Sequence, residues 1–236
     1  IASPTATTTY TVIATANGCS ASNTVTVTVN PNPDIALSTA GNAASVVGSS
    51  CLTQTLANND AVIYLNSSCN RILNIADEPA GSGLGSTSAC VNVSATNPVG
   101  SNGQVYAPRY FEIIPTVSEG AVMVAYFTQA DFDAYNAANG SLLDFPANSS
   151  DPNSANVLVA QVAGGTLATG TISSITPVFV SWNATDLRWQ VVFNATALGG
   201  YYYLYSNSTC NYTMPAATVS NITSSGAQFD WTSAGA

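Results

Sequence analysis

The chain has 236 residues, of which 46% are hydrophobic and 6% charged, so it can bury a sizeable core with far fewer charges than the roughly 25% of average domains. Its only cations are Arg71, Arg109 and Arg188, and its net charge is −9. It therefore lacks the cationic clusters with which proteins bind nucleic acid or anionic membranes, and we expect neither as a partner. Histidine and lysine are absent, so the usual general base, the commonest metal ligand and the Schiff-base amine are missing, and we expect no enzyme, no cofactor and no metal.

The pattern of the N-terminal segment predicts a hairpin. β-Branched residues alternate over 9–14 and 24–29, and Asn17-Gly18 between them supplies turn residues. Two prolines within 30–33 then end the ladder, because proline donates no backbone hydrogen bond. We therefore predict a boundary there, with residues 1–30 as one unit.

The central segment, residues 31–215, shows period-two alternation and predicts a β-sandwich. Turn-forming clusters such as Gly81-Ser82-Gly83 and Gly164-Gly165 separate its strands. One short helix is expected from the capping pattern of Thr128 and Asp131, ending near Asn139-Gly140. The predicted strands cover 61–65, 71–76, 89–95, 110–114, 121–127, 157–162, 179–182, 189–193 and 201–205.

A second boundary is predicted at Met214-Pro215, and residues 216–236 form the last unit. Within it, the sequence predicts two further strands, at 217–223 and 227–231. Two strands alone are at best marginally stable in water, so each end is expected to be part of a domain. The predicted fold class is all-β: a central sandwich with one helix, flanked by partial β-domains.

No run approaches the ~18 apolar residues of a membrane span, and the sequence lacks a signal-peptide pattern at its start, so we expect no membrane insertion. The five cysteines have no C-x-x-C spacing. Structural disulfides are the default interpretation, and they imply an oxidising, extracellular location at a cell surface or after secretion.

Four of the cysteines, Cys51, Cys69, Cys90 and Cys210, are the disulfide candidates. Cys69 and Cys90 bracket a strand and a glycine-rich turn, so a bond between them would staple a hairpin. Cys51 and Cys210 would then join the first and last strands of the central module, and Cys19 would find its partner outside the chain. Four cysteines allow three connectivities, so the alternatives stay open.

A family resemblance covers nearly the whole chain. Residues 2–12, with Asn17-Gly18-Cys19 and the alternation over 25–29, resemble the last strands of immunoglobulin-like repeats in secreted Bacteroidetes proteins. Residues 108–115, 126–136, 181–183 and 188–193 resemble a β-module of large surface proteins exported by type IX secretion. The tail, 217–223 with Phe229-Asp230-Trp231, is similar to the first strands of a fibronectin type III domain.

The resemblance implies a multidomain exported protein whose modules are spacers, adhesive surfaces or polymer units, and it carries over no catalytic residue. The run Tyr201-Tyr202-Tyr203 departs from the Gly-Phe-type ending of that module.

Acidic residues are the remaining candidates for metal binding or catalysis. Asp131, Asp133 and Asn136 lack the glycine and the terminal glutamate of a calcium loop, so helix capping is the favoured reading. Asp77-Glu78 is expected to face water.

Glycoside hydrolysis needs a pair of carboxylates, for which Glu112 and Glu119 are the candidates, but it is not the favoured interpretation. Glu112 alternates with apolar neighbours, so we expect it on the outer face of a strand, paired with Arg109.

Aromatic residues offer a possible binding surface for sugars, although packing in the core and at interfaces is the favoured role. They are Trp182, Trp189 and the cluster of Tyr201, Tyr202, Tyr203 and Tyr205. Asn-x-Ser/Thr sequons are possible glycosylation sites, and they also arise by chance in a chain rich in these residues. They lie at Asn66, Asn92, Asn139, Asn148, Asn183, Asn194, Asn207, Asn211 and Asn221.

Two functions follow from these observations. The first is a structural role, as a subunit or segment of an extracellular filament or adhesin fibre whose partners are other copies or modules of the same protein. The alternative is an adhesin module that binds glycans, cell surfaces or another partner through its aromatic and asparagine-rich loops.

Overall fold

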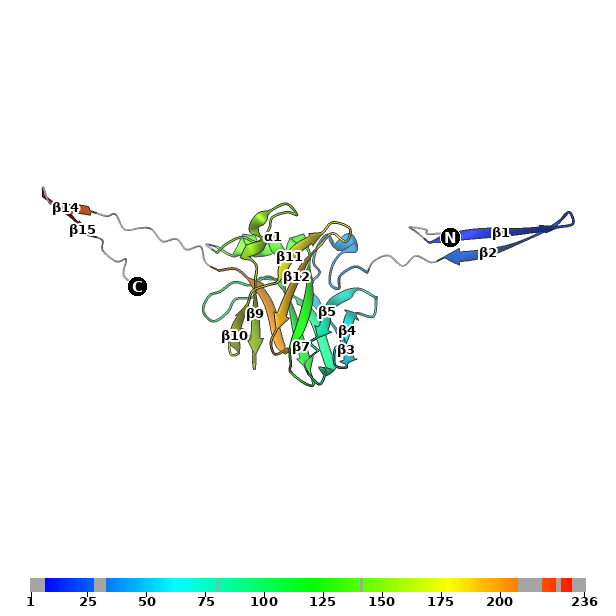
Figure 1. Cartoon of the computed structure of the whole chain (residues 1–236), viewed down its shortest axis with the longest axis horizontal. Helices are drawn as coiled ribbons and strands as arrows, with labels where there is room; N and C mark the ends of the chain where they lie inside the picture. Colours follow the sequence, from blue (N-terminus) through cyan, green and yellow to red (C-terminus); the bar gives the residue numbers. More distant parts are fainter. Residues whose placement is uncertain are drawn as a thin grey trace.

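The computed structural model describes residues 7–27, 33–79, 81–140, 142–207, 218–223 and 226–230, the last two ranges by their backbone only. Its centre is a sandwich of two antiparallel sheets (Figure 1). This confirms the all-β sandwich with one α-helix that the alternation predicts.

The larger sheet has six strands. Its spatial order is β10 (Thr171–Ile175), β9 (Leu158–Ala163), β13 (Gly200–Tyr205), β7 (Arg109–Pro115), β6 (Gly85–Val93) and β3 (Gly48–Leu56). The second sheet has five strands, in the order β11 (Phe179–Asn183), β12 (Arg188–Ala195), β8 (Ala121–Phe127), β5 (Arg71–Asp77) and β4 (Ala61–Leu65).

The core lies between the sheets because alternate residues of each strand point inward. In β7, Phe111 and Ile113 are buried, whereas Tyr110 and Glu112 point outward. From the facing sheet, Met123 and Trp189 join the same cluster. Every residue of that cluster lies at or after Ala36, so the sandwich closes its core without the N-terminal segment.

The helix α1 (Gln129–Ala138) begins as predicted. Thr128 accepts a hydrogen bond from the Asp131 backbone N–H, and the Asp131 carboxylate accepts one from the Thr128 backbone N–H, which completes a capping box. Phe132 and Tyr135 are the buried apolar residues of the helix. Two short 3₁₀ helices, η1 (Ala40–Asn42) and η2 (Pro152–Asn156), complete the helical structure of the described residues.

Arg109 holds the segment that leads into the sandwich. Its guanidinium forms a buried ion pair with Asp131, with Nε 2.8 Å from Oδ2. Nη1 and Nη2 donate to the carbonyls of Ala36 and Leu37, and Nη2 also donates to Ser45 Oγ. The predicted pairing of Arg109 with Glu112 is therefore wrong. Residues three apart in a strand point to opposite faces, so Arg109 lies inside and Glu112 outside.

Arg188 and Arg71 hold the same segment. Arg188 Nη1 donates to the Pro33 carbonyl and Nη2 pairs with Asp186. The Arg71 backbone exchanges hydrogen bonds with Asp34 and Ala36, and both guanidinium groups lie about 5 Å from the Tyr126 ring centroid. The side chains of Arg109 and Arg188 and the backbone of Arg71 thus hold residues 33–46 on the sandwich, which is a structural role.

Most predicted strands are present. The bounds of β4 and β8 are those predicted, and β5, β7, β9, β11, β12 and β13 differ by one or two residues at an end; β6 begins four residues earlier than predicted. No strand range was predicted for β3 or β10. These are the two edge strands of the six-stranded sheet, and their outward residues are largely Ser and Thr.

The predicted N-terminal hairpin is confirmed by β1 (Thr8–Ala16) and β2 (Cys19–Val27), which pair in register. Asn17 and Gly18 both have positive φ, 51° and 80°, as a two-residue hairpin turn requires. Near the other end, β14 (Thr218–Thr223) pairs with β15 (Gly226–Asp230). That these pairs belong to immunoglobulin-like and fibronectin type III-like domains stays a prediction.

Candidate functional site

The acidic candidates among the described residues make hydrogen bonds and an ion pair with separate partners. In the described part of the chain, no group of three or more Asp, Glu, Cys or His side chains is placed to bind a metal ion. Asp131 forms an ion pair with Arg109, and Asp133 accepts a hydrogen bond from Gln129. Asn136 exchanges hydrogen bonds with the Phe145 backbone.

The other carboxylates have separate partners. Asp77 accepts from the Asn59 backbone N–H, and Glu119 accepts from that of Ser82. Asp77 is buried, against expectation, and Glu78 is exposed. Glu112 lies on the outer face of β7, where its cross-strand neighbours are Cys90 and Tyr201. The structure gives Glu112 and Glu119 no shared partner.

The aromatic candidates do not form one surface. Trp189 is buried and donates through Nε1 to Gln129, while Trp182 is half-buried and packs edge-on against Trp189, with ring centroids 5.5 Å apart. Both tryptophans point inward from the five-stranded sheet. Tyr201 and Tyr203 lie instead on the outer face of the six-stranded sheet.

Tyr201 and Tyr203 belong to a tyrosine cluster that includes Tyr205, as predicted, but not Tyr202, which lies in the core between the sheets. Tyr106, Tyr110 and Tyr205 complete it, and Tyr110 stacks on Tyr203 with centroids 4.6 Å apart. A hydrogen bond with Glu112, together with partial burial, raises the pKa of Tyr201. Sequence reasoning missed Tyr106 and Tyr110. Residues 201, 203 and 205 share a face because they alternate on one strand, whereas Tyr110 joins them only through the pairing of β13 with β7.

Two core tyrosines predict how stability depends on pH. Burial raises the pKa of Tyr64 and of Tyr202 from 10.0 to about 12. The fold favours the neutral phenols, so this stabilisation is complete below pH ~10 and is lost as pH rises toward ~12, on the order of 2 kcal/mol for each residue. Denaturant unfolding from pH 8 to 12 should show that decline, with a late step in the absorbance titration of phenolate. Ionisation of every tyrosine near pH 10 in the folded protein would contradict it.

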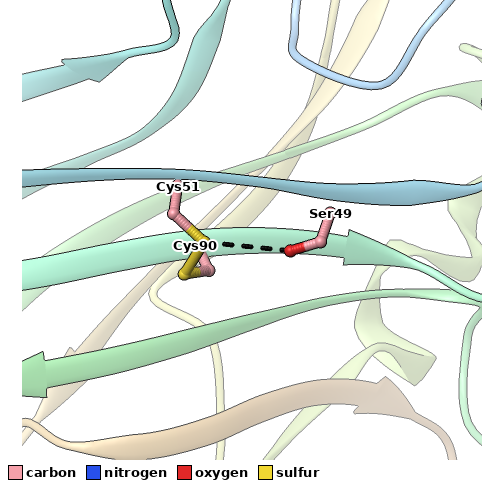
Figure 2. Close-up of a disulfide and its surroundings, with 3 residues drawn as sticks. All are labelled: Ser49, Cys51 and Cys90. Atoms are coloured by element: carbon pink, nitrogen blue, oxygen red, sulfur yellow. Dashed lines mark hydrogen bonds between the residues drawn. A yellow bond between two sulfur atoms is a disulfide. The ribbon is translucent and has the colours of Figure 1, made fainter.

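The disulfide joins Cys51 to Cys90, which lie directly opposite each other in β3 and β6 (Figure 2). The predicted pairing of Cys69 with Cys90 is wrong, because Cys69 lies in the turn between β4 and β5, in the other sheet. The predicted pairing of Cys51 with Cys210 is also wrong, because Cys51 is bonded to Cys90. Cys210 itself lies outside the described residues. Cys69 and Cys19 are free and exposed.

The sequons differ in accessibility. Asn148, Asn194 and Asn207 are exposed, and Asn66, Asn92 and Asn183 are half-buried. Asn139 is buried and its amide donates to Leu143 and Asp144. Asn211 lies outside the described residues, and only the backbone of Asn221 is described.

A hollow of about 520 Å³ lies at one end of the sandwich, between β7, β9, β10 and the 196–200 loop. Its polar side chains are those of Ser118, Gln161, Thr171, Ser173 and Thr196. Gln161 is held by the carbonyls of Ala197 and Gly199 and by the Tyr202 hydroxyl. No charged side chain lines this hollow, so it offers neither an acid–base group nor an ion partner to a ligand.

The N-terminal hairpin presents the most distinctive surface. Its register sorts the side chains into two faces. One, the hydroxyl face, carries cross-strand hydrogen bonds between Thr9 and Thr26 and between Thr15 and Ser20. The other, which we call the apolar face, consists of Thr8, Tyr10, Val12, Ala14, Ala16, Cys19, Ala21, Asn23, Val25 and Val27.

That apolar face is open to solvent. Val12 is 60% exposed, Val25 is 52% exposed and Val27 is 37% exposed. No charged residue occurs within residues 7–27, and Figure 1 shows the hairpin apart from the sandwich. A two-stranded ribbon with an uncovered apolar face gains stability from a partner sheet.

No family model matches the chain, and neither curated proteins nor solved structures give a significant match. Among the helices of the described residues, none has the length and apolar character needed to cross a membrane.

Proposed function

We propose that this chain is a non-catalytic structural segment of an extracellular filament or adhesin fibre, in which neighbouring modules meet through β-structure. The observation that carries the proposal is the uncovered apolar face of the β1–β2 hairpin, attached to a sandwich that closes its own core. Such a surface calls for association with another sheet.

Other features support a durable role outside the cell. The Cys51–Cys90 disulfide suits an oxidising environment. Of the three arginines, Arg109 and Arg188 are buried and Arg71 is half-buried, so the bonds that trypsin-like proteases recognise are shielded. Export by type IX secretion, as the sequence resemblance implies, belongs to the same proposal.

Self-association tests it. We expect the full chain to form concentration-dependent assemblies in sedimentation velocity and negative-stain microscopy, whereas a variant lacking residues 1–30 stays monomeric with the melting transition of a folded sandwich. A full chain that stays monomeric at every concentration would refute the proposal, as would equal assembly of both proteins.

Glycan binding is the second candidate, and the tyrosine cluster favours it, because three of the five rings are half-exposed on one sheet face. Saturable binding to a glycan array that Tyr201→Ala abolishes would support it. An array without hits would set it aside.

A further inference from the structure

The outer face of the five-stranded sheet is unusually apolar. The outward face of an antiparallel sandwich is ordinarily polar, because it meets water. Here one cross-strand row runs over all five strands, and four of its five members are apolar: Ile63, Asn74, Val124, Val192 and Phe179. Ile63 and Phe179 at its ends are 47% and 49% exposed.

The neighbouring row extends this surface. Ala61, Ala76 and Val122 lie next to one another in register. With Ile63, Asn74 and Val124 of the first row they line a shallow hollow of about 330 Å³. Asn74 is the one polar residue that lines it, and its Oδ1 is buried without a hydrogen-bond partner. We call these two rows on β4, β5 and β8 the outer apolar patch.

The opposite outer face differs in chemistry. On the six-stranded sheet, the outward residues are mostly polar: the tyrosine cluster, Glu112, Asn92, Ser49, Thr53, Thr55, Ser86 and Ser88, with Ile114 and Ile172 as exposed apolar members. Hydroxyl, amide and carboxylate groups suit contact with water. The two sheet faces are therefore unequal, and the one that gains most from being covered is the outer apolar patch.

We propose that the outer apolar patch receives the apolar face of the β1–β2 hairpin from a second copy of the chain. This inference rests on the proposed function and names the surface through which copies meet. Both surfaces are free of charged side chains, and two packed sheets lie about 10 Å apart, which suits interdigitation of Val12 and Val25 with Ile63 and Val124.

The polar groups of the two surfaces also match. Asn23 lies opposite Val12 on the apolar face of the hairpin, and its Oδ1 is taken by the Thr24 backbone N–H. Its Nδ2 has no partner in the described residues. Asn74 lacks a donor for its amide oxygen, so the Asn23 amide can supply one once the two faces meet and the Asn74 side chain turns toward it. A buried amide that gains its partner avoids the cost of an unpaired one.

The contact is head-to-tail, because the hairpin of one copy uses a different surface from the patch of the next. Heterologous contacts of this kind give rings when the rotation closes and open filaments when it does not. A contact of this kind, repeated from copy to copy, would therefore build a fibre.

Paired lysine substitutions test the contact with matched controls. Val12→Lys places a charge on the apolar face of the hairpin, and Ile13→Lys places it one residue away on the hydroxyl face, where Ile13 is 67% exposed. Likewise Ile63→Lys alters the patch, and Ile114→Lys alters the outer face of the other sheet, where Ile114 is 58% exposed. We expect Val12→Lys and Ile63→Lys to weaken self-association by at least ~100-fold, because each would bury an unpaired charge. Each control should stay within ~3-fold of the unmodified chain.

Mixing the two damaged chains tests whether the contact forms between copies. Val12→Lys keeps an intact patch and Ile63→Lys keeps an intact hairpin, so together they should form a one-to-one complex that grows no further. Assembly of the unmodified chain with no loss from either lysine would overturn this inference and leave the structural role intact. Loss from Val12→Lys alone would overturn the patch as the receiving surface. An unmodified chain that never assembles would overturn the proposed function as well.

Discussion

Replacing Arg109 with methionine is expected to lower the free energy of unfolding by about 3–5 kcal/mol, the cost of breaking a buried ion pair by removing one partner. Arg109 is 1% exposed and Asp131 is fully buried, so the remaining carboxylate cannot recover its hydration. The carbonyls of Ala36 and Leu37 would lose their donors at the same time. Urea unfolding of the purified chain measures the loss.

A matched control is present on the same helix. Asp133→Asn changes an exposed carboxylate that accepts a hydrogen bond from Gln129, and its effect should stay within about 0.5 kcal/mol. Hydrogen exchange adds a local test, because the Ile35 and Ala36 amides should lose protection in Arg109→Met before the central strands do. A loss below about 1 kcal/mol would show that Arg109 does not hold the entry segment.

Removing the disulfide should have the second-largest effect. Cys51 and Cys90 are 39 residues apart in the sequence, and closing a loop of that length restricts the unfolded chain by about 4 kcal/mol in the chain-entropy model, within a usual range of about 2–4 kcal/mol. The Cys51→Ser, Cys90→Ser double variant should therefore unfold at lower denaturant concentration. The unmodified chain with reductant should match it.

The free cysteine provides the control for that experiment. Cys69 is exposed and unbonded, so Cys69→Ser should leave stability unchanged within about 0.5 kcal/mol. Equal loss in Cys69→Ser and in the double variant would argue that Cys69, rather than Cys51, pairs with Cys90.

Local pattern predicted the fold well wherever a strand carries apolar residues on its inner face. The runs at β4 and β8 are bounded by turn residues and dominated by Val, Ile and aromatic side chains, so their ends were predictable. The edge strands β3 and β10 pair on one side only, and Ser and Thr fill much of their sequence. Their strand character comes from a neighbouring strand, which a local window cannot show.

Long-range pairing was the main limit. The disulfide depends on which strand lies beside β6, and cysteine spacing carries no information about register. Arg109 was different, because its alternation with Phe111 and Ile113 already placed it on the inner face. We nevertheless expected it outside, because a charged residue is rarely buried unless it is paired. Its partner, Asp131, comes from a separate helix, which the local pattern does not show.

The candidate surface was partly predictable. Alternation over β1 and β2 predicted the hairpin, but only the register shows that its faces differ and that Asn23 lies on the apolar face. The outer apolar patch draws residues from strands far apart in the sequence, and its defining row needs four strand pairings at once. The separation of Trp182 and Trp189 from Tyr201 and Tyr203 likewise follows from sheet assignment.

Electron cryo-microscopy of natively isolated material can show how copies of the chain meet. We expect regular filaments in which this chain repeats, with each β1–β2 hairpin packed on the outer face of the five-stranded sheet of its neighbour. Separate beads on a tether, with every hairpin covered by strands of its own polypeptide and no contact between copies, would contradict it.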